Sequence, residues 1–345
     1  MQELCIEKID LNSNERLEVE GFLSTFNLFF DKDIEYTVVA KSKGEILGTC
    51  SYAGKVLKCF AVKNGLQGEG IASKLVTHIT NQLFDRGIYE SFLFTEPKNL
   101  SIFKGLNYHE VHSVEEVSLL EGGMANVRRY TEKMYRNSGL SQEKKAALVM
   151  NCNPFTLGHR YLIEKTAREN KEVVVFIVEE NRSLFPFEVR LDLVKRGTED
   201  LENVYVLPGG SYIISSTTFP SYFLRQEGDR LKAYTKLDAG IFAKYIAPVF
   251  NIEKRYIGTE PYCKVTSQYN EALLATLPQQ GIEVVEVDRL NLQEKAVSAS
   301  EVRRLIRRED WCGIEGLVHP VTYKFLRSEA AKPVIEKIKR SDSPH

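Results

Sequence analysis

One short stretch near the middle of the chain combines phosphate-binding groups with the start of a helix. It reads Asn153-Pro154-Phe155-Thr156-Leu157-Gly158-His159, follows the apolar run AALVM and precedes an amphipathic helix. A helix start presents free N–H groups and the positive end of the helix dipole, which attract anions. Thr156 adds a hydroxyl, His159 adds a ring N–H, and Gly158 allows close approach to the backbone. The stretch predicts a phosphate site, and a strand–helix turn capped by Thr156 is an equal alternative.

A second stretch places hydroxyl groups at another helix start, followed one turn later by an arginine. It reads Val297-Ser298-Ala299-Ser300-Glu301-Val302-Arg303. Taken alone, this pattern is more typical of a capped basic helix at the surface. Two helix starts of this kind in one parallel sheet indicate a clamp for a polyphosphate, with Ser298, Ser300 and Arg303 as donors.

The length and composition restrict the class of protein. The chain has 345 residues, more than one ordinary core holds, which predicts two domains. The net charge is −1, so nucleic-acid binding is not favoured, and no apolar run reaches the roughly 18 residues of a membrane helix. The six cysteines are scattered, and the first residues lack a signal pattern. We therefore expect a cytoplasmic protein without disulfide bonds or a zinc site.

The two halves of the chain differ in the order of their predicted strands and helices. Residues 1–130 contain strand-like runs with inserted helices, as in an α+β sheet domain. The polar stretch 131–145 is predicted as a linker, with a last helix of the first domain and a short connector as the alternative. Residues 146–335 alternate strands and helices, and the run EVVVFIV is apolar throughout, which is typical of a parallel sheet covered on both faces. We predict a doubly wound α/β domain of about five parallel strands, followed by a frayed tail at 336–345.

The two phosphate stretches together resemble the signatures of the nucleotidylyltransferase superfamily. The first signature is Asn/Asp-Pro-x-[His/Thr]-x-Gly-His, and the second is Ile-Ser-Ser-Thr-x-x-Arg. Their internal spacing is intact here, but Ala299 replaces one hydroxyl residue. The resemblance implies an ATP site with His159, Thr156 and Arg303 as catalytic residues. It also implies Mg²⁺ held mainly through the ATP phosphates, no metal ligand from the protein, and phosphate contacts from Asn153, Phe155, Gly158, Ser298 and Ser300.

A glycine-rich loop in the first half has the form of a pyrophosphate-binding loop. The stretch 67–72, QGEGIA, follows a strand, opens a helix and matches Q-x-x-G-x-A. With SIFKGLNY downstream, it resembles the coenzyme A loop of the GCN5-related N-acetyltransferase fold. The resemblance implies that a coenzyme-A-type arm is bound by Gln67, Gly68, Gly70 and Ala72, with a plain turn as the alternative. Phe103 stands where those acetyltransferases carry a general-acid tyrosine, so we expect docking rather than catalysis in this domain.

The length, the domain order and several loops resemble the citrate lyase ligase family over nearly the whole chain. The loops are SLFPFEVRLDLVKRGTEDL, YIISSTTFPSYFL and YIGTEPYCKVTSQYN. The resemblance implies that ATP and acetate form acetyl adenylate, with pyrophosphate released. The acetyl group then passes to the thiol of a dephospho-coenzyme-A-type group on the acyl carrier subunit of citrate lyase, and AMP leaves. No tightly bound organic cofactor is expected.

Two hypotheses from other classes remain open at this point. One is a small-molecule adenylyltransferase of the mononucleotide or pantetheine-phosphate type, with a regulatory first domain. The other is a coenzyme-A-dependent acetyltransferase whose second half senses a nucleotide. Acetate-dependent exchange between ATP and pyrophosphate separates the ligase from both.

Three further stretches are weaker candidates for the same site. Arg190, in the predicted helix FEVRLDLV, either returns a cation to the phosphates or, equally, lies in solvent. Thr259 and Glu260 follow the strand RYIG and are predicted to face the adenosine or a metal ion, with a plain strand end as the alternative. Residues 213–223, IISSTTFPSYF, form either a wall of the acetate pocket or a packed loop.

Overall fold

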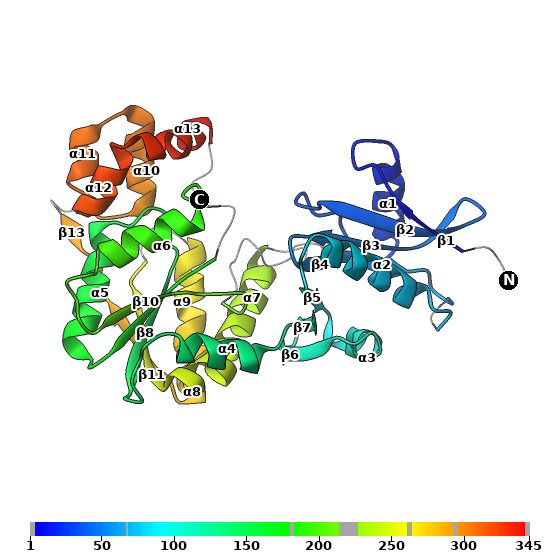
Figure 1. The fold of residues 1–345 in the computed structure, drawn as a ribbon, viewed down its shortest axis with the longest axis horizontal. Coiled ribbons are helices and arrows are strands. Elements are labelled where there is room, and N and C mark those ends of the chain that lie inside the picture. Colours follow the sequence, from blue (N-terminus) through cyan, green and yellow to red (C-terminus); the bar gives the residue numbers. More distant parts are fainter. Residues whose placement is uncertain are drawn as a thin grey trace. The chain divides into compact units, whose positions relative to one another are not determined.

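The computed structural model describes residues 4–66, 68–179, 183–213, 227–260, 264–292 and 295–341. Of these, residues 4–130 and 227–237 form one compact unit, and residues 131–213 and 238–341 form the other (Figure 1). We call them the N-terminal unit and the C-terminal unit. No described helix is long and apolar enough to cross a membrane.

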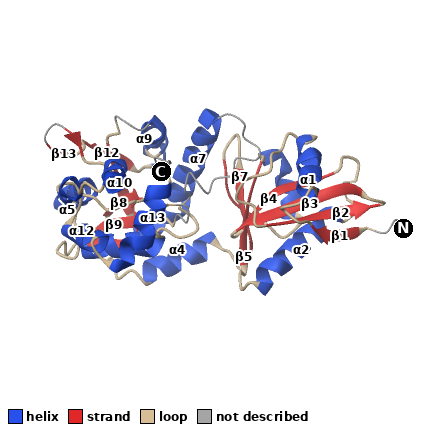
Figure 2. Cartoon of the chain, turned by 90° about the horizontal axis from the view of Figure 1, so that it is seen from above, coloured by secondary structure: helices blue, strands red, loops and turns tan. Residues whose placement is uncertain are grey.

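The N-terminal unit is a seven-stranded sheet with a helix on each face, as the alternation of strands and helices predicts. The strand order is β1-β2-β3-β4-β5-β7-β6. Val19 and Leu23 of the first helix pack on one face of the sheet, and Leu75 and Ile79 of the second pack on the other (Figure 2). The elements are β1 (Cys5–Lys8), α1 (Glu15–Ser24), β2 (Tyr36–Ser42), β3 (Glu45–Ala53), β4 (Val56–Val62), α2 (Ile71–Asp85), β5 (Glu90–Thr95), a 3₁₀ turn (Pro97–Asn99), α3 (Leu100–Lys104), β6 (His109–Ser113) and β7 (Ser118–Gly123).

The strands β4 and β5 diverge after a short parallel contact. They pair only at Val56 with Phe92 and at Leu57 with Leu93 among the described residues. Further along, β3 is the one described strand that pairs with β4, through a register shift near Cys59, whose φ is 51°. The backbone of β4 beyond Leu57 is therefore unpaired on its β5 side, as at a sheet edge that accepts an added extended chain.

The C-terminal unit is built on the predicted five-stranded parallel sheet. The strand order is β10-β9-β8-β11-β12, so the chain reverses direction across the sheet between β8 and β11. Ligands of open α/β sheets bind beyond the carboxyl ends of the strands at such a switch point. The strands are β8 (Lys145–Met150), β9 (Val173–Ile177), β10 (Val204–Pro208), β11 (Ile252–Gly258) and β12 (Glu283–Val287), with a separate pair β13 (Asn291–Leu292) and β14 (Lys295–Ala296).

Helices cover both faces of this sheet, which explains the wholly apolar strand β9. Ile163 of α5 and Leu193 of α6 pack on one face, and Phe242, Phe250 and Leu273 pack on the other. From residue 127 onward, the helices of the chain are α4 (Val127–Arg136), α5 (Leu157–Glu169), α6 (Phe187–Arg196), α7 (Glu227–Ile241, of which residues 227–237 belong to the N-terminal unit), a π-helical turn (Phe242–Ile246), α8 (Ala247–Phe250), α9 (Lys264–Thr276), a 3₁₀ turn (Pro278–Gln280), α10 (Ala299–Arg308), α11 (Trp311–Glu315), α12 (Pro320–Leu326), a 3₁₀ turn (Glu329–Ala331) and α13 (Lys332–Arg340).

Two stretches predicted as linker and tail, 131–145 and 336–345, contain helical residues, and at 131–145 a helix is followed by a connector, as in the alternative. The range 131–145 contains the last turns of α4, and Tyr135 of this helix packs edge-on against Phe250 in the core, with ring centroids 5.4 Å apart. The end of the chain forms α10 to α13, the orange and red helices of Figure 1. Ile338 is fully buried among these helices, so the chain is ordered through Arg340 rather than frayed from residue 336.

Candidate functional site

The first phosphate stretch forms a capped helix start that also orients the His159 ring. Thr156 is the N-cap of α5, and its Oγ1 accepts a hydrogen bond from the His159 N–H at 3.4 Å. In return, the Thr156 backbone N–H donates to Nδ1 of His159 at 3.1 Å. Since a backbone N–H can only donate, Nδ1 carries no proton, and the neutral ring holds its hydrogen on Nε2. The helix cap and the predicted phosphate site are therefore compatible, because the hydrogen bonds of the cap also fix the tautomer of His159.

His159 is held in its neutral form. The ring is half-buried at the start of α5. Burial lowers the pKa of His159 to about 4, and the nearby positive charge of Arg289 acts in the same direction. At neutral pH, the side chain therefore acts as an N–H donor and not as a cation.

The structure brings the two phosphate stretches into direct contact. A β-carbon built on Gly158 would lie 3.0 Å from the carbonyl oxygen of Val297, so the bare α-carbon lets the two backbones meet. Ser298 is the N-cap of α10 and accepts a hydrogen bond from the Glu301 N–H at 3.1 Å. Two helix starts therefore lie together near the carboxyl end of β8, each presenting backbone N–H groups.

Arg303 joins the two stretches from inside. Its side chain donates to the Asn153 carbonyl oxygen and, at 3.1 Å, to Ser300 Oγ. Burial lowers the pKa of Arg303 to about 10, which leaves it charged at neutral pH. The residue is only 4 % exposed, so its charge acts from beneath the loop.

The Phe155 side chain belongs to the core rather than to the ligand surface. It is fully buried, and its ring lies nearly parallel to that of His159, with centroids 6.2 Å apart. A β-carbon on Gly197 would come within 2.4 Å of the Phe155 ring, so the packing behind it is close. The side chain therefore packs behind His159, and the predicted contact of Phe155 with ATP stays a prediction for its backbone alone.

Arg190 is a buried residue and not the solvated arginine of the alternative, while its role as a cation for the phosphates stays a prediction. It is fully buried and donates to the carbonyl oxygens of Asn151 at 2.7 Å, Val178 at 2.9 Å and Phe185 at 3.0 Å. Asn153 contributes to the same network, because its Oδ1 accepts from the Phe185 N–H at 3.0 Å. These bonds hold together the segments that follow β8 and β9, and the predicted phosphate contact of Asn153 stays a prediction.

A further cation, missed in the sequence, lies at the end of the neighbouring strands. Arg289 follows β12. Its side-chain Nε donates to the Thr259 carbonyl oxygen at 2.6 Å, and its backbone N–H donates to Thr259 Oγ1 at 3.1 Å. Its guanidinium also forms an ion pair with Glu260. The rule that ligands lie beyond strand ends points to this position, two residues after β12, but no recognised motif contains it.

The acidic side chain at this edge is already engaged. The Glu260 side chain is 7 % exposed, and its carboxylate forms an ion pair that holds the Arg289 side chain in place. Among the described residues, no group of three or more His, Cys, Asp or Glu side chains is placed to hold a metal ion. The predicted pocket segment extends from Ile213, which is buried, into residues 214–223, which lie outside the described chain.

The N-terminal loop has the backbone that its glycines predict. Gly68 has φ 91°, and Gly70, the N-cap of α2, has φ 77°; both are left-handed conformations that favour glycine. Ala72 lies in the first turn of α2, and Gln67 falls outside the described residues. Phe103 is buried against Phe60, with ring centroids 5.1 Å apart, so no general acid stands at this position.

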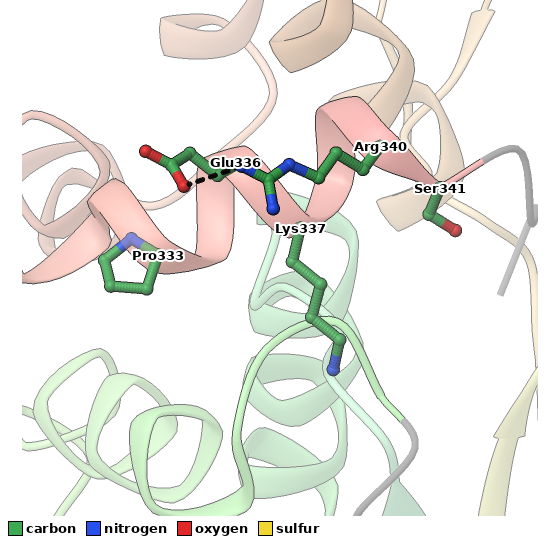
Figure 3. A pocket seen from close by; sticks show the side chains of 5 residues that line it. All are labelled: Pro333, Glu336, Lys337, Arg340 and Ser341. Atoms are coloured by element: carbon green, nitrogen blue, oxygen red, sulfur yellow. Dashed lines mark ion pairs between the residues drawn. The ribbon is translucent and has the colours of Figure 1, made fainter.

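A surface hollow on α13 is separate from these residues. It has a volume of about 410 Å³ and is lined by Pro333, Glu336, Lys337, Arg340 and Ser341 (Figure 3). Glu336 and Arg340 pair with each other across one helical turn. None of the predicted site residues lines this hollow, so we place the site at the end of the sheet instead.

The fold and this edge define the C-terminal unit as a nucleotidylyltransferase-like domain, joined to an acetyltransferase-like unit. Residues 145–326 match the family described as citrate lyase ligase C-terminal domain, and residues 6–102 match the acetyltransferase (GNAT) family. The chain therefore belongs to the citrate lyase ligase family.

Individual relatives agree with this assignment. The chain is 35 % identical to the [citrate [pro-3S]-lyase] ligase of Escherichia coli over 330 residues, which are 93 % of each chain. It is also 35 % identical to that of Klebsiella pneumoniae, over 94 % of this chain and 96 % of the relative. A phosphopantetheine adenylyltransferase of Corynebacterium efficiens is 24 % identical over 41 % of this chain and 96 % of its own. The family predicted from the sequence is confirmed.

The contact between Gly158 and Val297 can be tested by stability. Gly158→Ala adds a methyl group against a carbonyl oxygen, and we expect it to lower the free energy of unfolding by about 1–3 kcal/mol. Gly21→Ala is the control, because Gly21 lies in α1 with open space around it, and alanine there should add up to about 1 kcal/mol. Urea denaturation measures both. A stabilised Gly158→Ala variant would show that the two stretches do not approach closely.

Proposed function

We propose that the C-terminal unit activates acetate with ATP and that the N-terminal unit holds the thiol arm that receives the acetyl group. The acceptor is the prosthetic group on the acyl carrier subunit of citrate lyase, in line with the names of the relatives. The observation that carries the proposal is the contact of the two phosphate stretches beside a neutral His159. This arrangement supplies donors for a triphosphate at a sheet switch point.

The first step needs positioning and charge stabilisation. An acetate oxygen attacks the α-phosphorus of ATP, a new P–O bond forms, and pyrophosphate leaves with the electrons of the broken bond. His159 offers Nε2–H to the negative charge that grows on the α-phosphate oxygens, while Arg303 supplies positive charge from beneath the loop. The N–H groups at the starts of α5 and α10 hold the other phosphate oxygens.

Mg²⁺ fits this scheme as a partner of ATP. The carboxylate at the sheet edge, Glu260, is paired with Arg289, which fits an ion held through phosphate oxygens. Bound in this way, Mg²⁺ shields phosphate charge from the incoming carboxylate.

In the second step, the thiol releases its proton to solvent and its sulfur attacks the acetyl carbonyl carbon; a C–S bond forms, the bond between the acetyl carbon and the phosphate oxygen breaks, and AMP leaves with that electron pair. The glycine loop before α2 supports a role in holding the pyrophosphate of a coenzyme-A-type arm, and the unpaired side of β4 suits an extended pantetheine chain. The buried Phe103 fits a unit that binds the arm without acid catalysis. Holding the thiol near the adenylate raises the transfer rate through proximity.

His159→Ala tests the adenylation step. We expect acetate-dependent exchange between ATP and pyrophosphate to fall roughly 100- to 1,000-fold, because one preorganised donor to the transition state is removed. His109→Ala, at an exposed position on β6, is the control and should keep full exchange. Exchange close to that of the unchanged protein in His159→Ala would remove this residue from the mechanism.

Gly70→Glu tests the docking role in the full chain. A carboxylate at the start of α2 repels a pyrophosphate, so we expect acetyl transfer to the thiol form of citrate lyase to fall at least tenfold while ATP–pyrophosphate exchange persists. Gly87→Glu is a matched control at the other end of the same helix, because Gly87 also has positive φ, 75°, and open surroundings. If both variants transfer acetyl equally well, the loop does not hold the arm.

A further inference from the structure

Arg289 has one guanidinium nitrogen that is positioned but uncommitted. Its Nε donates to the Thr259 carbonyl oxygen, and its Nη2 pairs with Glu260. Among the described residues, Nη1 has no hydrogen-bond or ion-pair partner, and the side chain is 24 % exposed. Two of the three nitrogens thus hold the group in place, which leaves the N–H groups of the third as donors for a ligand.

The position of Arg289 relates it to the reacting groups. The strand β11 lies between β8 and β12, and Arg289 reaches back from the end of β12 to Thr259 at the end of β11. This brings its charge toward the loop that follows β8, and that positive charge contributes, after burial, to the lowered pKa of His159. The arginine and the neutral histidine therefore flank the same part of the sheet edge.

The proposed reaction leaves one substrate charge without a partner. Acetate and the α-phosphate of ATP are both anions, and they must approach within bonding distance. The phosphates have the two helix starts and Arg303, but the carboxylate has no cation among these donors. A guanidinium forms strong, directional hydrogen bonds to carboxylates, and Arg289 already makes one to Glu260.

We propose that Arg289 binds the carboxylate of acetate through Nη1 and orients its free oxygen toward the α-phosphorus. This inference rests on the proposed function. In the step, the acetate oxygen forms the new P–O bond and the bond to pyrophosphate breaks, without transfer of a proton. Glu260 and Thr259 are positioning residues, because they act on acetate only through Arg289.

The test is acetate-dependent ATP–pyrophosphate exchange with the full chain, with acetate and ATP varied separately. In Arg289→Met, we expect KM for acetate to rise roughly 10- to 100-fold, as for loss of a hydrogen bond to a charged group, with KM for ATP changed less than about threefold. Arg289→Lys keeps the charge but not the fork, so it should show a smaller increase. Arg304→Met is the control, because Arg304 lies on the exposed side of α10 in its own pair with Glu301.

Two further measurements separate binding from a merely structural role. Guanidinium added to Arg289→Ala should restore part of the exchange rate at low acetate. Synthetic acetyl adenylate should acetylate the carrier thiol at a near-normal rate in Arg289→Met, because this step no longer uses a free carboxylate.

The outcomes are distinct. An increase confined to KM for ATP would assign Arg289 to the phosphates and overturn the inference. Unchanged KM values in both Arg289→Met and Arg289→Lys would show that Arg289 only forms a surface ion pair and would also overturn the inference. Equal loss of exchange and of transfer from acetyl adenylate would mean a structural role. If the unchanged protein shows no acetate-dependent exchange, the proposed function fails together with the inference, whereas failure of the Arg289 variants alone leaves the proposed function standing.

Discussion

The close approach of Gly158 to the Val297 carbonyl oxygen is the constraint on which the C-terminal unit depends. It joins the segment after the first strand of the sheet to a helix start almost 140 residues later, and a β-carbon at residue 158 would lie only 3.0 Å from that oxygen, which the backbone would have to relieve by shifting. Arg303 and Asn153 reinforce the same junction through the loop carbonyl. Because the free N–H groups of a helix start point along the helix axis and out of its N-terminal end, bringing two such starts together concentrates positive potential at one edge of the sheet. The phosphate chemistry proposed for this unit depends on this junction more than on any single side chain.

Positive charge at this edge of the sheet lies on arginine side chains held in place by hydrogen bonds, and not on His159. His159 stays neutral, because burial and the Arg289 charge both disfavour a second proton. A neutral donor binds the ground-state phosphate only modestly and gains as charge develops during attack, which is the difference that lowers a barrier. The guanidinium groups are permanent cations held by carbonyl oxygens or a carboxylate, so little reorganisation is needed when anions arrive. The arrangement therefore suits a reaction between two anions.

Sequence patterns predicted the architecture well, because strand burial and helix periodicity are local properties. The apolar run of β9 indicated a sheet covered on both faces, and the sheet has five parallel strands. The roles of Phe155 and Arg190 were beyond such patterns, since a motif position does not reveal whether its side chain faces a ligand or the core. Arg289 was missed for a related reason: its significance comes from the order β8-β11-β12, which the chain order alone does not determine. The helices α11 and α12 are short, and their periodicity was too weak to predict them.

The two units divide the proposed chemistry by the nature of each barrier. Adenylation requires donors aimed at developing charge, and the C-terminal unit provides them at a rigid sheet edge. Transfer of acetyl from an adenylate to a thiol is chemically easier, since AMP is a good leaving group, and its difficulty is to bring a carrier-bound sulfur to a reactive intermediate before water attacks it. A binding unit is sufficient for this step without a general acid, because capture of the arm raises the local thiol concentration near the adenylate. On this argument, the phenylalanine at position 103 fits a step that differs from the one the acetyltransferases catalyse. There, a tyrosine donates a proton to a leaving thiolate. Here, the thiol is the nucleophile and not the leaving group, so a unit that only holds the arm does not need that proton donor.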